Sequence, residues 1–249
     1  MTNSLPAASS FASTGDAPHA PSAPDVLAAL RAATGTRHDA VEGAMPLAAE
    51  STLGAYRRHL LLIRAWLAPF EHAFAEFDDG PQDEAHVRHF PNFARVARLP
   101  LIERDLAHPT LRAFHDPVAT GFAPAAPALQ TDAAWRWGAC YVIEGSQLGG
   151  AVLLRRLREP LAPHPLHYLG GEGAGPGPRW HAFVAALRAA VRTPHEVERA
   201  CAGACDAFDR LIAVLSAPDA PSNAPSNAMP PAMPGADPAA RGVPDEHAA

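Results

Sequence analysis

One histidine in the N-terminal part of the chain is placed to bind a metal. His38 lies in the segment LRAATGTRHDAVEG (30–43), and Glu42 follows it at the i+4 position. On a helix these two side chains share a face, and a histidine that ligates a metal commonly donates its second ring N–H to a carboxylate. The pair therefore predicts one imidazole ligand oriented by Glu42. The alternative is an ordinary surface or core histidine, since the chain contains 13 histidines.

A second unusual segment, WRWGACYVIEGSQLGGAVLLRRLRE, combines helical apolar spacing with four glycines. Each interior glycine destabilises a helix by about 1 kcal/mol relative to alanine. Gly138, Gly145 and Gly149 fall within about 40° of one another at about 100° per residue, so they form a stripe of bare backbone. This stripe has two interpretations, which are close packing against another helix or a flat ligand laid against the backbone.

Other catalytic signatures are missing from the sequence. It has no HExxH or Glu-x-x-His pattern, which argues against zincin and ferritin-like dimetal sites. It also lacks a G-x-S-x-G elbow, a Walker motif and a dinucleotide-binding glycine motif. Asp105 and His108 form one carboxylate-x-x-His pair, which is a weak signal alone. Three cysteines are too few for a disulfide framework.

Length and composition limit the class of protein. The chain has 249 residues, of which 48% are hydrophobic and 18% charged, so it can bury a substantial core. It contains neither an apolar run long enough to span a membrane nor a signal-peptide pattern, and we expect a cytoplasmic protein with no membrane partner. All 20 basic residues are arginine, and the formal net charge of −6 argues against nucleic acid as a partner.

Helical signals run through the middle of the chain, from about residue 25 to 216. Apolar residues recur three and four apart, helix-start signals occur at 24–25, 51–52, 100, 178 and 194, and one long helix is predicted from about 131 to 158. No segment has the period of a strand. Residues 1–24 and 217–249 are rich in Pro, Ala and Ser and are predicted to be disordered. We expect a monomeric, single-domain, all-α protein of seven or eight helices.

Taken together, these features resemble the bacterial heme oxygenases, and in particular the branch found beside bacteriophytochromes. The resemblance rests on four segments in order: LRAATGTRHDAVEG (30–43), LPLIERDLAHPTL (99–111), YVIEGSQLGG (141–150) and YLGGEGAGPGPRWHAF (168–183). It extends from about residue 25 to 215, which is the whole predicted helical core. It implies a heme-oxygenase-like multi-helical bundle in which heme lies between a proximal and a distal helix.

The resemblance implies roles for residues on the proximal side. His38 matches the ligand of the heme iron, and Glu42 matches the carboxylate that hydrogen-bonds this ligand. Relatives often bind the heme propionates with lysine, which this chain lacks. Arg31, Arg179 and His181 are the expected cationic substitutes.

The resemblance also implies roles on the distal side. Gly145, Gly149 and Gly150 match the glycines that lie over the heme face. Ser146 stands where the animal enzymes have an aspartate. Gly145 backbone groups and Ser146 are therefore the candidates for directing bound oxygen and holding ordered water, and Gly145, Ser146 and Gly149 form the predicted catalytic set.

The implied reaction is the O2-dependent opening of heme b, which is both substrate and cofactor, to biliverdin with release of iron and carbon monoxide. Electrons are expected from a ferredoxin, a flavodoxin or a flavin reductase, for which the basic segment 155–158 would suit an acidic partner. A bacteriophytochrome is an expected acceptor of biliverdin.

Two alternative functions stay open from the sequence. A heme-binding or heme-delivery protein of the same fold would bind heme without turnover. A helical phosphotransfer or interaction module would use one exposed histidine and would have no affinity for heme.

Overall fold

The computed structural model describes residues 25–45, 47, 50–84, 93–114, 132–171 and 175–217. Within these residues it contains helices and a single isolated β-bridge, which confirms the all-α prediction. The helices are α1 (Val26–Ala44), α3 (Leu53–Ala75), α4 (Leu99–Leu106), α5 (Pro109–Arg112), α6 (Ala133–Leu157), α7 (His167–Gly170), α8 (Pro176–Ala190) and α9 (Pro194–Leu215). The tails predicted at 1–24 and 217–249 lie outside the described residues, apart from residue 217.

The helix starts follow the capping signals of the sequence. Asp25 caps α1 and Thr52 caps α3, each by accepting a backbone N–H of the first turn. Thr193 and Glu196 form a capping box at the start of α9. Pro69 was expected to end or bend its helix, but α3 continues beyond it.

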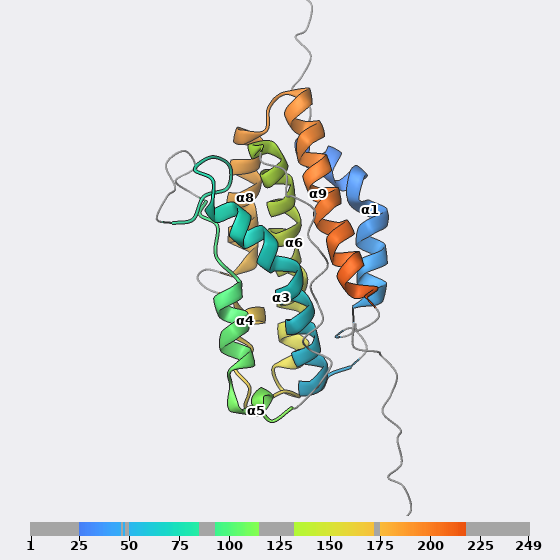
Figure 1. Cartoon of the computed structure of the whole chain (residues 1–249), viewed down its shortest axis with the longest axis vertical. Coiled ribbons are helices and arrows are strands. Elements are labelled where there is room, and N and C mark those ends of the chain that lie inside the picture. The colour runs from blue at the N-terminus through green and yellow to red at the C-terminus, as the bar shows by residue number, and fades with distance from the viewer. Residues whose placement is uncertain are drawn as a thin grey trace, which may run out of the picture.

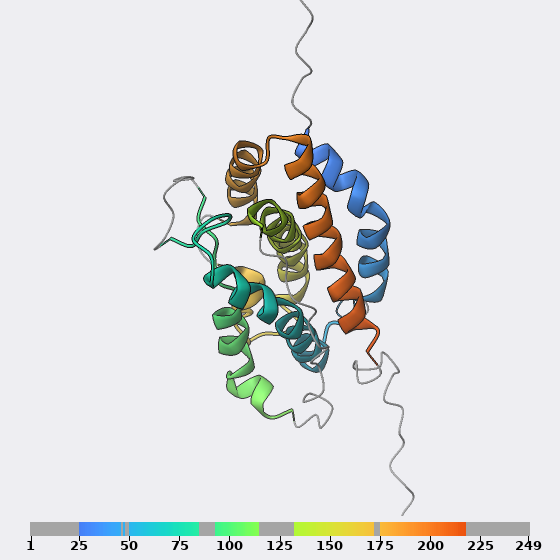
Figure 2. The same ribbon diagram turned by 45° about the horizontal axis from the view of Figure 1, so that its top comes forward.

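The central element of the fold is α6 (Figure 1). On one side it packs against α9, and α9 in turn carries α1 on its outer flank (Figure 2). On the other side lie α8 and the pair α3 and α4 (Figure 1). The interior between these layers is rich in large aromatic side chains that are almost completely buried: Trp66, Trp135, Trp137, Phe70 and Phe183.

Two glycines allow α6 and α9 to meet backbone to backbone. A Cβ atom added to Gly138 would lie 1.8 Å from the Ala200 carbonyl oxygen, and one added to Gly203 would lie 2.0 Å from the Trp135 carbonyl oxygen. Any side chain at either position would force the helices apart. The Trp135 indole also donates a hydrogen bond to Asp206 on α9, at 2.9 Å. Close helix packing therefore explains Gly138, the first glycine of the predicted stripe.

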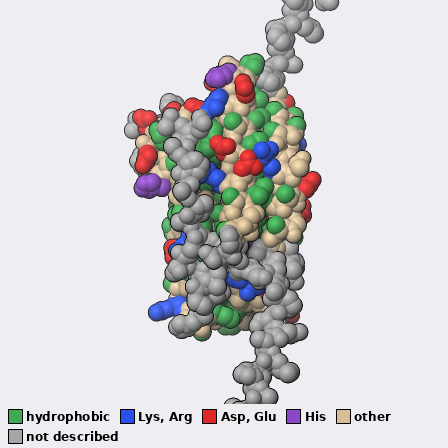
Figure 3. Space-filling view, turned by 45° about the vertical axis from the view of Figure 1, so that its right-hand side comes forward, with side chains coloured by type: hydrophobic (Ala, Val, Ile, Leu, Met, Phe, Trp, Pro, Cys, Tyr) green, Lys and Arg blue, Asp and Glu red, His purple; other side chains and the backbone are tan. Residues whose placement is uncertain are grey.

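The side of the molecule formed by α1 and α9 carries charges of both signs. In Figure 3 acidic and arginine side chains are interspersed over these helices. One exposed pair joins them, because Arg37 donates to both carboxylate oxygens of Asp209, at 2.7 and 3.1 Å. None of the helices in the described ranges has the length and apolar character needed to cross a membrane.

One buried histidine of α3 is poorly satisfied. His59 is 5% exposed, and its Nδ1 has no hydrogen-bond partner. Burial lowers the pKa of His59 to about 4, because the imidazolium form loses its hydration. The folded protein therefore holds this side chain in its neutral form.

We expect His59 to make the protein sensitive to acid. In the unfolded chain a histidine titrates near pH 6.5, so the unfolded state binds more protons between about pH 6.5 and 4, and stability falls as the pH falls through this window. The contribution reaches about 3 kcal/mol at the acid end. Urea unfolding at several pH values should give a flatter profile for His59→Leu than for the exposed control His72→Gln. Equal profiles for the two variants would contradict this assignment.

Candidate functional site

The face of α6 that α9 covers at Gly138 is open further along the helix. A Cβ atom at Gly149 would meet no atom within 4 Å, and one at Gly145 would meet only the Trp180 ring, at an ordinary 3.6 Å. Val152 falls on the same face at about 100° per residue and is 57% exposed. This stretch of α6 therefore presents bare backbone and apolar side chains that no other described residue covers closely.

Two contacts place α1 beside this open face. Near the start of the pair, Tyr141 on α6 interacts with the side chain of Thr34 on α1. Near its end, the Arg156 guanidinium donates to the carbonyl oxygen of Leu47, just beyond α1. Both helices meet the two contacts in the same chain order, so α1 and α6 run in the same direction between them.

The histidine and the glycines occupy matching turns between these contacts. His38 follows Thr34 by four residues, and Gly145 follows Tyr141 by four. Residues four apart lie on one helix face, so each residue lies one turn beyond the first contact, on the face that makes it. The structure thus brings the two predicted motifs to the same gap between α1 and α6.

His38 is accessible to a ligand in this gap. Its side chain is 65% exposed, and its Nδ1 lies 3.8 Å from a Glu42 carboxylate oxygen and 4.0 Å from Asp39. The carboxylates are therefore on the Nδ1 edge, and Nε2 is on the opposite edge of the ring. The imidazole packs edge-on against Phe208 of α9, with 6.2 Å between ring centroids.

The cationic residues predicted for the propionates lie in different surroundings. Arg31 is exposed on α1, and its charge acts on Tyr141, whose pKa is raised by burial and partly lowered by Arg31. Arg179 of α8 instead makes two hydrogen bonds of 2.7 Å to Glu144. His181 is exposed on α8. The partner of Arg179 was not foreseen from the sequence.

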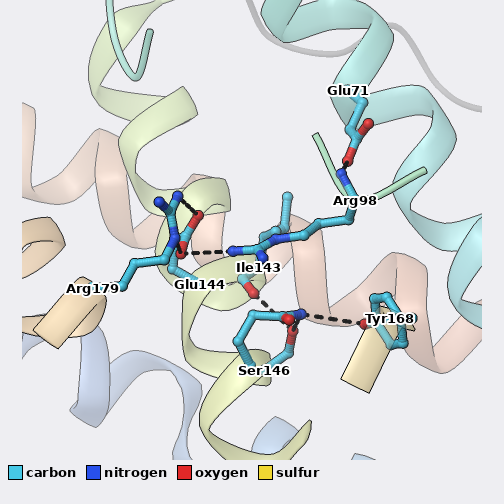
Figure 4. Close-up of polar contacts among 8 residues, drawn as sticks. Glu71, Arg98, Ile143, Glu144, Ser146, Tyr168 and Arg179 are labelled. Carbon is cyan, nitrogen blue, oxygen red and sulfur yellow. Dashed lines mark hydrogen bonds and ion pairs between the residues drawn. The ribbon is translucent and has the colours of Figure 1, made fainter. Parts of the chain in front are cut away.

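Glu144 is the centre of a buried ionic cluster directly before Gly145. Its side chain is 2% exposed and accepts hydrogen bonds from Arg179 and, at 3.2 Å, from Arg98 (Figure 4). The Arg98 backbone N–H donates to Glu71 of α3 at 2.5 Å, and burial raises the pKa of Glu71. The cluster ties α6 to α8, α4 and α3 where the open glycine face begins.

Four residues of the site were missed by the sequence reasoning. Tyr141 and Thr34 lie one helical turn before the glycine and histidine motifs, so extending each motif by one turn would have found them. Trp180 and Phe208 reach the site from α8 and α9, and no local pattern announces them. Over the described ranges, no group of three or more His, Cys, Asp and Glu side chains is placed to hold a metal ion.

The fold and the site define an all-α protein that can hold a flat apolar ligand between a histidine-bearing and a glycine-bearing helix. The heme oxygenase family model matches residues 25–217. The chain is also 36% identical over 126 residues to a heme oxygenase from Xanthomonas campestris pv. campestris (strain 8004), a match that covers 50% of this chain and 70% of that protein. The chain therefore belongs to the heme oxygenase family.

The residues of the gap fit heme, the ligand that family membership implies. The absence of close neighbours around the added Cβ of Gly149 leaves α6 thin enough for a porphyrin plane. The exposed apolar side chains of Leu148 and Val152 suit its apolar faces, and His38 offers a nitrogen from the opposite helix. Family membership and this fit together support action on heme.

Proposed function

We propose that the chain binds heme b between α1 and α6 and cleaves it with O2 to biliverdin, releasing iron and carbon monoxide. The observation that carries the proposal is the open glycine face of α6, which lies in the same gap as His38. Bound heme supplies the iron centre that activates O2 and is itself the molecule oxidised. The protein contributes binding, orientation and electrostatics.

On the α1 side, His38 coordinates the iron through Nε2, and Glu42 holds the ring through Nδ1. A neutral imidazole gives the iron less electron density than a thiolate would, and therefore favours O–O cleavage less. Arg31 is placed to pair with a propionate at the Tyr141 end of the gap. Arg179 and His181 are the candidates from α8.

On the α6 side, Gly145, Gly149 and Gly150 let the helix backbone approach the porphyrin. Gly145 backbone groups and the Ser146 hydroxyl orient the small molecules that occupy this side of the ligand. The bare backbone also restricts the space above the ring, which directs oxidation toward its edge.

Electrons come from a separate protein of the ferredoxin, flavodoxin or flavin reductase class in this proposal. Arg155 and Arg158 are exposed at the end of α6 and offer positive charge to an acidic donor. We further propose that the chain works as a cytoplasmic monomer and that a bacteriophytochrome accepts its biliverdin.

An aerobic absorbance time course tests the proposed function. Purified protein is loaded with hemin and reduced slowly with ascorbate, with catalase present to remove free peroxide and with an iron chelator. We expect the Soret band to decay while a red biliverdin band grows. A stable Soret band under these conditions and with each donor class would favour a heme-binding protein without turnover. The lack of any hemin complex would favour the phosphotransfer or interaction module.

A further inference from the structure

Three polar side chains meet behind the open face of α6. Ser146 donates a hydrogen bond from Oγ to the Ile143 carbonyl oxygen, at 2.7 Å. The Gln147 amide nitrogen lies 3.4 Å from both Ser146 Oγ and the Tyr168 hydroxyl (Figure 4). Ser146 is next to Gly145 in the chain, so this group begins at the border of the ligand face.

The Tyr168 side chain is fixed from its backbone by a buried carboxylate. Asp105 of α4 is fully buried and accepts the backbone N–H groups of Tyr168 and His167, at 2.8 and 2.9 Å. It also accepts the Tyr56 hydroxyl at 2.6 Å. These bonds hold the first residues of α7 rigidly against α4, and they direct Tyr168 toward α6.

The surroundings of Tyr168 keep its hydroxyl protonated. Tyr168 is 4% exposed, and burial raises its pKa while contacts with Gln147, Arg98 and Ser146 oppose this rise. The carboxylate of Glu71 also raises it. The His59 ring lies 6.2 Å away, centroid to centroid. At neutral pH the phenol is therefore a hydrogen-bond donor.

We propose that Tyr168 is a positioning residue that controls the hydroxyl of Ser146. Tyr168 donates to Ser146 Oγ, and this frees the Ser146 proton to turn from the Ile143 carbonyl toward a small molecule on the α6 side of heme. A hydroxyl proton rotates to suit its partners, so no backbone movement is needed. The inference rests on the proposed function, because it assumes that heme occupies the gap.

Tyr168→Phe tests this role through the spectrum of the ferric hemin complex. The midpoint of its pH-dependent absorption change reports the proton affinity of the small ligand opposite His38. A donated hydrogen bond favours the deprotonated form of such a ligand, so its loss should raise the midpoint by about half a pH unit, a roughly threefold change in proton affinity. Tyr56→Phe is the matched control, because it removes another buried hydroxyl from Asp105 without touching Ser146.

A double-mutant cycle with Ser146→Ala separates positioning from general structural damage. Since Tyr168 acts through Ser146, adding Tyr168→Phe to Ser146→Ala should move the midpoint no further. An unchanged or lowered midpoint in Tyr168→Phe, an equal rise in Tyr56→Phe, or additive effects in the double variant would overturn the inference while leaving the proposed function intact. Failure of the wild-type protein to form a hemin complex would overturn both.

Discussion

Replacing Gly138 with alanine is expected to unfold the protein, whereas replacing Gly149 with alanine should stabilise the ligand-free form and weaken heme binding. The two glycines lie on one face of α6, three turns apart. A methyl group at Gly138 would lie 1.8 Å from the Ala200 carbonyl oxygen, so α6 and α9 would have to separate at a loss of about 3 kcal/mol or more. At Gly149 the methyl group meets nothing within 4 Å.

The expected gain at Gly149 comes from helix propensity. Alanine favours an exposed helix by about 1 kcal/mol over glycine, and the ligand-free protein should gain up to this amount. The same methyl group enters the gap that we assign to heme, so hemin affinity should fall about tenfold. Urea unfolding of both variants and hemin titration of Gly149→Ala measure these effects. Unchanged hemin affinity in Gly149→Ala would remove the case for a ligand on this face.

Replacing His38 with alanine should abolish heme cleavage without disturbing the fold. Because the side chain is 65% exposed, its removal should change the free energy of unfolding by less than about 0.5 kcal/mol. Loss of the iron ligand should also alter the absorption spectrum of the ferric hemin complex. Glu42→Gln should reduce turnover less severely, since the carboxylate orients the imidazole without binding the iron.

A second histidine provides a close control for this prediction. His72 lies on α3 with Glu76 at i+4, 3.5 Å away, and its side chain is 84% exposed. It therefore has the same local arrangement as the pair on α1 but lies on a different helix. His72→Ala should retain normal turnover and a normal hemin spectrum. Turnover that survives in His38→Ala at the wild-type rate would refute the assigned role of His38.

The helices could be predicted from local signals, but the partners of individual residues could not. Asp25, Thr52 and Thr193 cap helices where the sequence places them, because capping depends on residues within one turn. The pairing of Arg179 with Glu144 joins two helices far apart in the chain, and nothing near either residue signals it. A lone glutamate within the apolar run YVIEG was the available hint that a buried cation must accompany it.

The glycine stripe illustrates the same limit. Periodicity correctly places Gly138, Gly145 and Gly149 on one face, and it offers close packing or a flat ligand as the reason. The choice depends on where α9 crosses α6, which is a tertiary property. Close packing applies at Gly138, and an open face is found at Gly145 and Gly149, so the two interpretations divide the stripe between them.

The contact between Gly138 on α6 and Ala200 on α9 has a mechanical consequence. Since α1 packs on α9 and is joined to it by Arg37 and Asp209, the crossing acts as a fulcrum, and α9 with α1 forms a lever. Gly149 lies about 16 Å beyond Gly138 along the axis of α6, so a rotation of about 4° at the crossing changes the separation there by about 1 Å. Side chains packed around the fulcrum, far from the iron ligand, can therefore tune how tightly the protein grips its flat substrate.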